Sequence, residues 1–133
     1  MVRYKDVPTS FLLDTHVFLW LMEENPRITK SLINTLKDPQ HTLFLSIASV
    51  WELTIKKMKN GLEIPNDFDK VLKKGGINLL PIELKHVQGL EDLPPIHNDP
   101  FDRILISQAR CDGYTLISAD SKMSKYDVLL IKV

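Results

Sequence analysis

Residues 11–20 constrain the fold more than any other stretch, because an apolar run stops at Asp14 and then resumes with helical spacing. This pattern is typical of a buried parallel strand that ends at a carboxylate and passes directly into a helix. In open α/β sheets, ligands bind outside the carboxyl ends of the strands. Asp14 is therefore the first candidate for a functional side chain, and other acids at the same edge would join it in one site.

Strand-like and helix-like segments alternate to the end of the chain. Strands are expected at residues 11–13, 43–45, 77–82, 114–117 and 128–131, and helices at residues 17–22, 28–36, 47–60, 67–74, 83–90 and 100–112. Ser46 and Asp99 are suitable N-caps, and Gly61 is a suitable C-terminal stop. The alternation predicts an α/β/α sandwich with a central parallel sheet of about five strands and helices on both faces. Right-handed crossovers then bring all strand ends to one edge.

The composition is that of one ordinary folded domain, expected to span residues 1–133. Hydrophobic residues make up 44% and charged residues 26%, which excludes a disordered or disulfide-rich chain. With 17 basic and 17 acidic side chains, no global positive field attracts nucleic acid, so local patches must do so. The single cysteine, Cys111, cannot form an intramolecular disulfide. Because the N-terminus also shows no signal peptide or membrane span, we expect a cytoplasmic protein.

Four acidic residues follow predicted strands or lie near the start of the next helix: Asp14, Glu52, Asp102 and Asp120. Each has an ordinary structural explanation, because acids are favoured at helix starts. Asp14 and Asp120 could cap the segments that follow them. Glu52 has capping-box spacing from Ser49. Asp102 is the third residue of the helix that Asp99 opens.

Considered together, the four acids indicate a metal site. In a parallel sheet all of them lie within about one helical turn of a strand end or a helix start, so they can face one cleft. Carboxylates without an interleaved Lys or Arg repel one another, and a divalent cation relieves that repulsion. An all-oxygen set of ligands suits Mg²⁺ or Mn²⁺ and argues against zinc.

The acids lie in four segments of the chain: residues 13–16 (LDTH), 46–52 (SIASVWE), 99–109 (DPFDRILISQA) and 116–120 (LISAD). In order and spacing these segments resemble the acidic motifs of the PIN domain, especially those of VapC-like toxin ribonucleases. The resemblance covers nearly the whole chain and implies a PIN-like fold. It also implies a Mg²⁺- or Mn²⁺-dependent endoribonuclease whose acidic quartet is Asp14, Glu52, Asp102 and Asp120. Asp14 and Asp102 are expected to bind metal directly, and Glu52 and Asp120 to act through water or to position the nucleophile.

Two carboxylates in residues 99–102 compete for the third place in the quartet. Asp102 is favoured because the family's acid precedes an apolar helix with the spacing that Asp102 has to Ala109. Asp99 then remains the N-cap of that helix. Ser118 lies where the resemblance places a Ser or Thr near the metal, which makes it a secondary site residue.

Lys56 and Arg103 are the candidates for binding RNA phosphates. An ion pair of Lys56 with Glu52, or of Arg103 with a neighbouring acid, fits the spacing equally well. The histidines, His97 among them, show no ligand spacing with Cys or with one another. Trp51 is expected in the core or at an interface rather than as a platform for base stacking.

The resemblance also implies partners: an RNA substrate, a cognate antitoxin protein and a second copy of the chain in a homodimer. Four apolar side chains of the first two helices could form a groove for such a partner, or could belong to the core: Phe18, Leu21, Met22 and Ile28. The alternative to the enzyme is a catalytically inactive PIN-like module that only binds RNA or protein.

Overall fold

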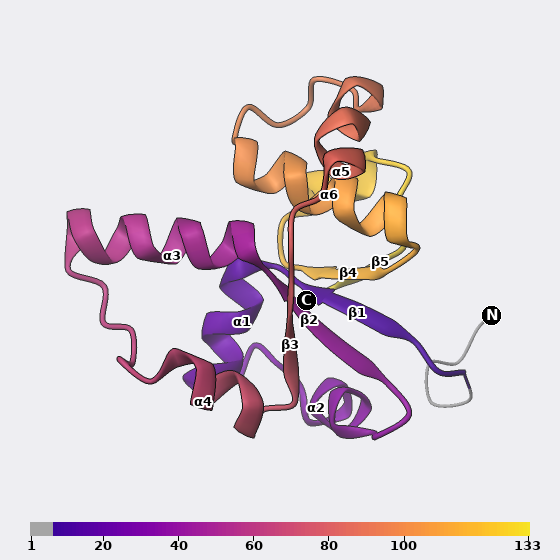
Figure 1. Cartoon of the computed structure of the whole chain (residues 1–133). Coiled ribbons are helices and arrows are strands. Elements are labelled where there is room, and N and C mark those ends of the chain that lie inside the picture. Colours follow the sequence, from indigo (N-terminus) through magenta and orange to yellow (C-terminus); the bar gives the residue numbers. More distant parts are fainter. Residues whose placement is uncertain (1–6) are drawn as a thin grey trace.

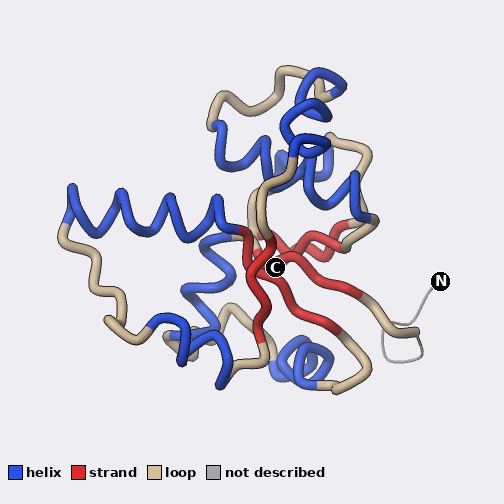
Figure 2. The backbone as a smooth tube through the Cα atoms, viewed as in Figure 1, coloured by secondary structure: helices blue, strands red, loops and turns tan. Residues whose placement is uncertain are grey.

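The computed structural model describes residues 7–133, and its centre is a sheet of five parallel strands (Figures 1 and 2). The strand order is β3-β2-β1-β4-β5, with these bounds: β1 Ser10–Leu13, β2 Thr42–Ser46, β3 Ile77–Leu80, β4 Thr115–Ser118 and β5 Leu130–Lys132. The first strand therefore occupies the middle, between β2 and β4. In register, Leu12 is paired with Phe44 of β2 and Leu116 of β4, so the carboxyl ends of these three strands lie side by side.

Six α-helices and two short 3-10 helices connect the strands in the described part of the chain. The α-helices are α1 Thr15–Met22, α2 Lys30–Lys37, α3 Ile47–Asn60, α4 Phe68–Lys74, α5 Leu84–Gln88 and α6 Pro100–Asp112, and the 3-10 helices are η2 Gly89–Asp92 and η3 Ser121–Lys125. The expected caps are present. The Ser46 hydroxyl accepts the Ala48 N–H at the start of α3, and Gly61 ends that helix with φ 68°.

Two hydrophobic layers lie on opposite faces of the sheet and confirm the predicted sandwich. Phe11 and Leu13 of β1 belong to the cluster that includes Leu53 of α3 and Leu72 of α4. The intervening Leu12 belongs to the other cluster, whose helical members come mainly from α6. Alternation of side chains along a strand explains this division. Figure 1 shows the result, with α2 and α4 on one side of the sheet and α5 and α6 on the other.

Most of the expected boundaries differ from the structure by one or two residues, and for two strands the reason is local. The third strand ends at Leu80 rather than at residue 82, because Pro81 has no N–H to continue the ladder. The last strand begins at Leu130 rather than at residue 128, because the Val128 N–H bonds locally to the Tyr126 carbonyl. The turn or short helix expected after Asp120 is the 3-10 helix η3, which Asp120 caps.

Residues 1–6, on which the expectation of no signal peptide rests, lie outside the described residues. Within residues 7–133, every helix is too short or too polar to span a membrane.

Candidate active site

The central strands bring Asp14 and Ser118 together. Asp14 follows β1 and is 6% exposed, and it occupies the N-cap position of α1 without a side-chain capping bond. Instead, its Oδ2 atom accepts a hydrogen bond of 2.6 Å from the Ser118 hydroxyl at the end of β4. The Ser118 oxygen in turn accepts the Asp120 N–H at 3.1 Å. One buried hydroxyl thus links two acids that are 106 positions apart in the sequence.

Glu52 lies in the second turn of α3. Its interpretation as a capping-box partner of Ser49 is wrong, because Ser46 caps the helix and Ser49 lies inside its first turn. The Ser49 hydroxyl instead accepts a hydrogen bond of 2.8 Å from Thr15, which joins the starts of α1 and α3. The Glu52 side chain is 15% exposed and has Lys56 Nζ 3.6 Å from its Oε2 atom. The expected i,i+4 ion pair is therefore present.

Asp102 is the third residue of α6, and the charges of the other acids act on it. Burial, the nearby negative charges of Asp99 and Asp14, and that of Glu52 raise its pKa to about 7. Asp99 has the structural role expected of it, because its Oδ1 atom accepts the Phe101 N–H at 2.8 Å. Acids from three segments of the chain therefore converge around Asp102.

Asp120 begins η3 and has a histidine partner. Its Oδ1 atom accepts the Lys122 N–H at 2.9 Å, and its Oδ2 atom lies 2.7 Å from His97 Nε2. Although burial acts to raise it, these hydrogen bonds hold the pKa of Asp120 below its ordinary value. Ligand atoms of His97, Asp102 and Asp120 lie within 4.8 Å of one another.

His97 is the site residue that the sequence analysis missed. His97 is 8% exposed, and its partner Asp120 is 23 positions further along the chain. A search for histidines spaced close to Cys or to one another cannot find such a pair. The available signal was the position of His97 two residues before the capping Asp99, where a stiff proline-containing loop leads into α6.

Arg103 points away from this cluster. Its guanidinium donates hydrogen bonds to three main-chain carbonyls, those of Pro94, Leu90 and Leu93, at 2.9, 3.3 and 3.4 Å. It has no ion pair with an acid in residues 7–133. Of the two alternatives considered for Arg103, the salt bridge to a neighbouring acid is therefore wrong, and Arg103 stabilises the loop before α6.

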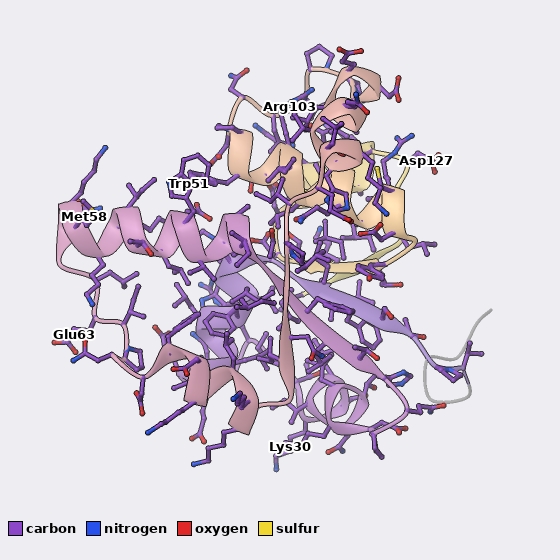
Figure 3. The ribbon with its side chains drawn as sticks, in the orientation of Figure 1. Lys30, Trp51, Met58, Glu63, Arg103 and Asp127 are labelled. Carbon is purple, nitrogen blue, oxygen red and sulfur yellow. The ribbon has the colours of Figure 1, made fainter. Side chains whose placement is uncertain are left out.

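Trp51 is not a core residue, in contrast to one of the two locations expected for it. It is 59% exposed and meets Phe101 edge to face, with ring centroids 5.1 Å apart. Figure 3 shows Trp51 on α3 facing the start of α6. The aromatic pair thus connects α3 with the start of α6, one residue before Glu52 and Asp102 in the sequence.

A second group of possible ligands, Glu83, His86 and Asp112, is already neutralised. Lys85 Nζ lies 2.6 Å from Asp112 Oδ1, and His86 Nε2 lies 2.8 Å from Asp112 Oδ2. The Glu83 N–H donates to His86 Nδ1, so neither ring nitrogen is free. These interactions lower the pKa of Asp112 against the effect of burial. The group is thus an ion-pair network with no need of a cation.

A groove of about 860 Å³ lies along α1 and α2 and reaches the first residues of β2 and β3. Leu21, Met22 and Ile28 line it, but Ile28 also belongs to the buried core, as does Phe18. Leu43 and Ile77, at the amino ends of their strands, complete the lining. The groove is therefore at the opposite edge of the sheet from the acids.

Comparisons with known proteins agree with this architecture. The chain is similar in structure to VapBC2 of Rickettsia felis bound to a promoter DNA fragment (TM-score 0.70, 14% identity, 93% of this chain and 98% of that chain). It is also similar to VapBC-1 of nontypeable Haemophilus influenzae (0.68, 19%, 93% and 98%) and to a toxin-antitoxin complex from Klebsiella pneumoniae (0.63, 16%, 91% and 95%). At these identities the similarity shows the fold.

At the level of sequence, no curated protein matches significantly. The profile of the PIN domain matches residues 11–129, which include all four acids. This match extends over nearly the entire chain and agrees with the five-stranded parallel sheet. The chain therefore belongs to the PIN domain family.

Proposed function

We propose that this protein is a metal-dependent endoribonuclease and the toxin of a type II toxin-antitoxin pair. The observation that carries the proposal is the convergence of acids from distant segments, with Asp102 and Asp120 ligand atoms within 4.8 Å and Asp14 tied to Asp120 through Ser118. Such a cluster is unfavourable by itself, and a divalent cation neutralises it. Membership of the PIN domain family supports a nuclease.

The donor set fits Mg²⁺ or Mn²⁺, because the four acids offer carboxylate oxygens and both ring nitrogens of His97 have hydrogen-bond partners. Asp14 and Asp102 are the proposed direct ligands, and Glu52 and Asp120 act through water or orient the attacking water. When bound, the cation lowers the pKa of a water and neutralises charge on the scissile phosphate. Ser118 orients the Asp14 carboxylate, and no side chain is required as a nucleophile.

The proposed partners follow from the same family. Structural neighbours described as VapBC and as toxin-antitoxin complexes support an antitoxin as a partner of this chain. The groove along α1 and α2 is the apolar surface that we propose for it. A homodimer and a cytoplasmic location remain part of the proposal. Lys56 and Arg103 were the two candidates for binding RNA phosphates. Lys56 is retained, because the Arg103 guanidinium already donates hydrogen bonds to main-chain carbonyls.

The test is cleavage of a labelled single-stranded RNA by the purified protein with Mn²⁺, Mg²⁺ or EDTA. We expect cleavage with either cation, none with EDTA, and none for Asp14→Asn, which keeps the shape of the side chain and an acceptor for Ser118. Circular dichroism verifies that the variant is folded. RNA binding without cleavage in every condition would support the inactive binding module instead. Cleavage by Asp14→Asn at the wild-type rate would contradict the assigned site.

A further inference from the structure

His97 is almost completely buried, and both of its ring nitrogens have partners. Nε2 lies 2.7 Å from Asp120 Oδ2, and Nδ1 lies 2.8 Å from the hydroxyl of Tyr126. The two aromatic rings stack, with centroids 5.3 Å apart. Tyr126 is itself 5% exposed, so the chain Tyr126, His97, Asp120 runs from the core to the acidic cluster.

The position of each proton follows from one additional contact. The main-chain N–H of His97 donates to the Tyr126 oxygen at 2.9 Å. The phenol proton is then free to point at Nδ1, which must accept it, and the remaining ring proton lies on Nε2 and is donated to Asp120. In the other neutral tautomer, a lone pair on Nε2 would face the Asp120 carboxylate, and the buried phenol proton would lose Nδ1 as its acceptor.

This arrangement determines what His97 can do. With Nδ1 accepting and Nε2 donating, the ring has no lone pair for a metal, although its atoms lie within ligand distance of Asp102 and Asp120. Its effect falls on Asp120, whose two oxygens are held by His97 and by the Lys122 N–H. Hydrogen bonds of this kind orient ligating carboxylates and strengthen metal binding.

We propose that Tyr126 and His97 are a positioning pair, in which Tyr126 selects the His97 tautomer and His97 fixes the Asp120 carboxylate for the cation. The inference rests on the proposed function, because it assumes that the acidic cluster binds a divalent metal. His97 is a positioning residue and not a ligand.

Two measurements test the pair without RNA. Long-range ¹H–¹⁵N spectra of the metal-free protein report which ring nitrogen of His97 is protonated, and we expect Nε2 alone in the wild type and a mixture in Tyr126→Phe. Titration with Mn²⁺ alone, followed by electron paramagnetic resonance, gives its dissociation constant. We expect this constant to rise roughly 10- to 100-fold in His97→Ala. His97→Gln, whose amide nitrogen can reach the Nε2 position, should remain within about threefold of the wild type, as its donor is retained.

His86→Ala is the matched control. His86 is also fully buried and bonded through Nε2 to an aspartate, Asp112, so its removal should destabilise the fold to a similar extent. Because His86 lies in the separate ion-pair network, its loss should leave Mn²⁺ binding unchanged. Thermal unfolding in EDTA measures the structural effect of each variant. Weakened Mn²⁺ binding in His86→Ala would show that general destabilisation accounts for the effect and would overturn the inference.

The remaining outcomes separate this inference from the proposed function. Normal Mn²⁺ binding by His97→Ala, or an Nδ1 proton in the wild type, would overturn the positioning pair alone. A loss of preference for Mn²⁺ over Mg²⁺ in His97→Gln would instead identify His97 as a nitrogen ligand. Mn²⁺ binding with the expected variant pattern but no RNA cleavage would leave the pair intact and refute the ribonuclease. A wild type that binds no Mn²⁺ would refute both.

Discussion

The negative charges of neighbouring acids oppose the ionisation of Asp102, so the stability of the metal-free protein should depend on pH. Its folded-state pKa, about 7, lies above its ordinary value of 3.8. The folded chain therefore holds the proton more tightly, and the free energy of unfolding falls as the pH rises from about 4 through 7. We expect metal-free Asp102→Asn to exceed the wild type in stability at pH 8 by about 1–2 kcal/mol, a value reduced for solvent screening. Urea unfolding in EDTA measures the difference.

The same two proteins at pH 5 provide the control for Asp102. At that pH most of the folded wild type carries a neutral Asp102, so the two unfolding curves should lie much closer together than at pH 8. If the wild type were more stable than Asp102→Asn at pH 8, the neighbouring charges would not destabilise the ionised Asp102.

Ser118 links two acids through one buried hydroxyl, so Ser118→Ala should affect both stability and metal binding. The substitution leaves the Asp120 N–H without its acceptor and Asp14 Oδ2 without its donor. We expect a loss of about 1–3 kcal/mol in the free energy of unfolding and weaker Mn²⁺ binding. Ser107→Ala is the matched control, because the Ser107 hydroxyl is equally buried but bonds to the His86 carbonyl. Equal effects of both variants on Mn²⁺ binding would contradict the role of Ser118.

The sequence indicated the acids of the candidate site, which remain a prediction, but not the groups that orient them. Asp14, Asp102 and Asp120 follow strands or open helices, and such positions are readable from apolar patterning and capping residues. The His97 contact with Asp120 depends on how the loop before α6 packs against η3, a tertiary relation with no local signal. The sequence left Trp51 between the core and an interface for the same reason, because an apolar helix position does not reveal whether a neighbour covers it.

At the scale of elements, the loop between η2 and α6 carries His97, and Arg103 holds this loop in place. The charged guanidinium of Arg103 donates hydrogen bonds to the carbonyls of Leu90, Leu93 and Pro94. We expect Arg103→Ala to lower the free energy of unfolding by about 1–3 kcal/mol. Arg103→Lys should recover only part of it, because an ammonium lacks the planar fork. Chemical denaturation measures both effects.

RNA binding gives the second readout for Arg103. If Arg103 served as a phosphate contact, Arg103→Ala would flatten the dependence of RNA affinity on salt concentration by about one unit of slope. We expect an unchanged slope for Arg103→Ala and a flatter slope for Lys56→Ala, measured with catalytically inactive Asp14→Asn as the background. A flatter slope for Arg103→Ala would restore it as an RNA contact.

Element order and type were readable from the sequence because the strands are mainly apolar and the two longest helices, α3 and α6, have a capping residue and a glycine stop. The ends of β3 and β5 were placed incorrectly by two residues each, since strand length depends on which N–H groups find a neighbouring strand. The 3-10 helix η3 follows from the Asp120 side chain accepting the Lys122 N–H. The pattern around Asp120 indicated a turn or a short helix without distinguishing them.

Across the whole molecule, the proposed metal site exists only when the chain is folded, because its acids span positions 14 to 120. Mn²⁺ at 100 times its dissociation constant should therefore stabilise the protein by about 2.7 kcal/mol, or roughly 10 °C in Tm for a domain of this size. EDTA should reverse the shift, and Asp14→Asn should show little of it. Asp99→Asn is the matched control, because asparagine also caps helices and Asp99 lies outside the proposed quartet. A full shift in Asp14→Asn would place the cation away from the carboxyl ends of the central strands, and a loss of the shift in Asp99→Asn would identify Asp99 rather than Asp102 as the third acid of the site.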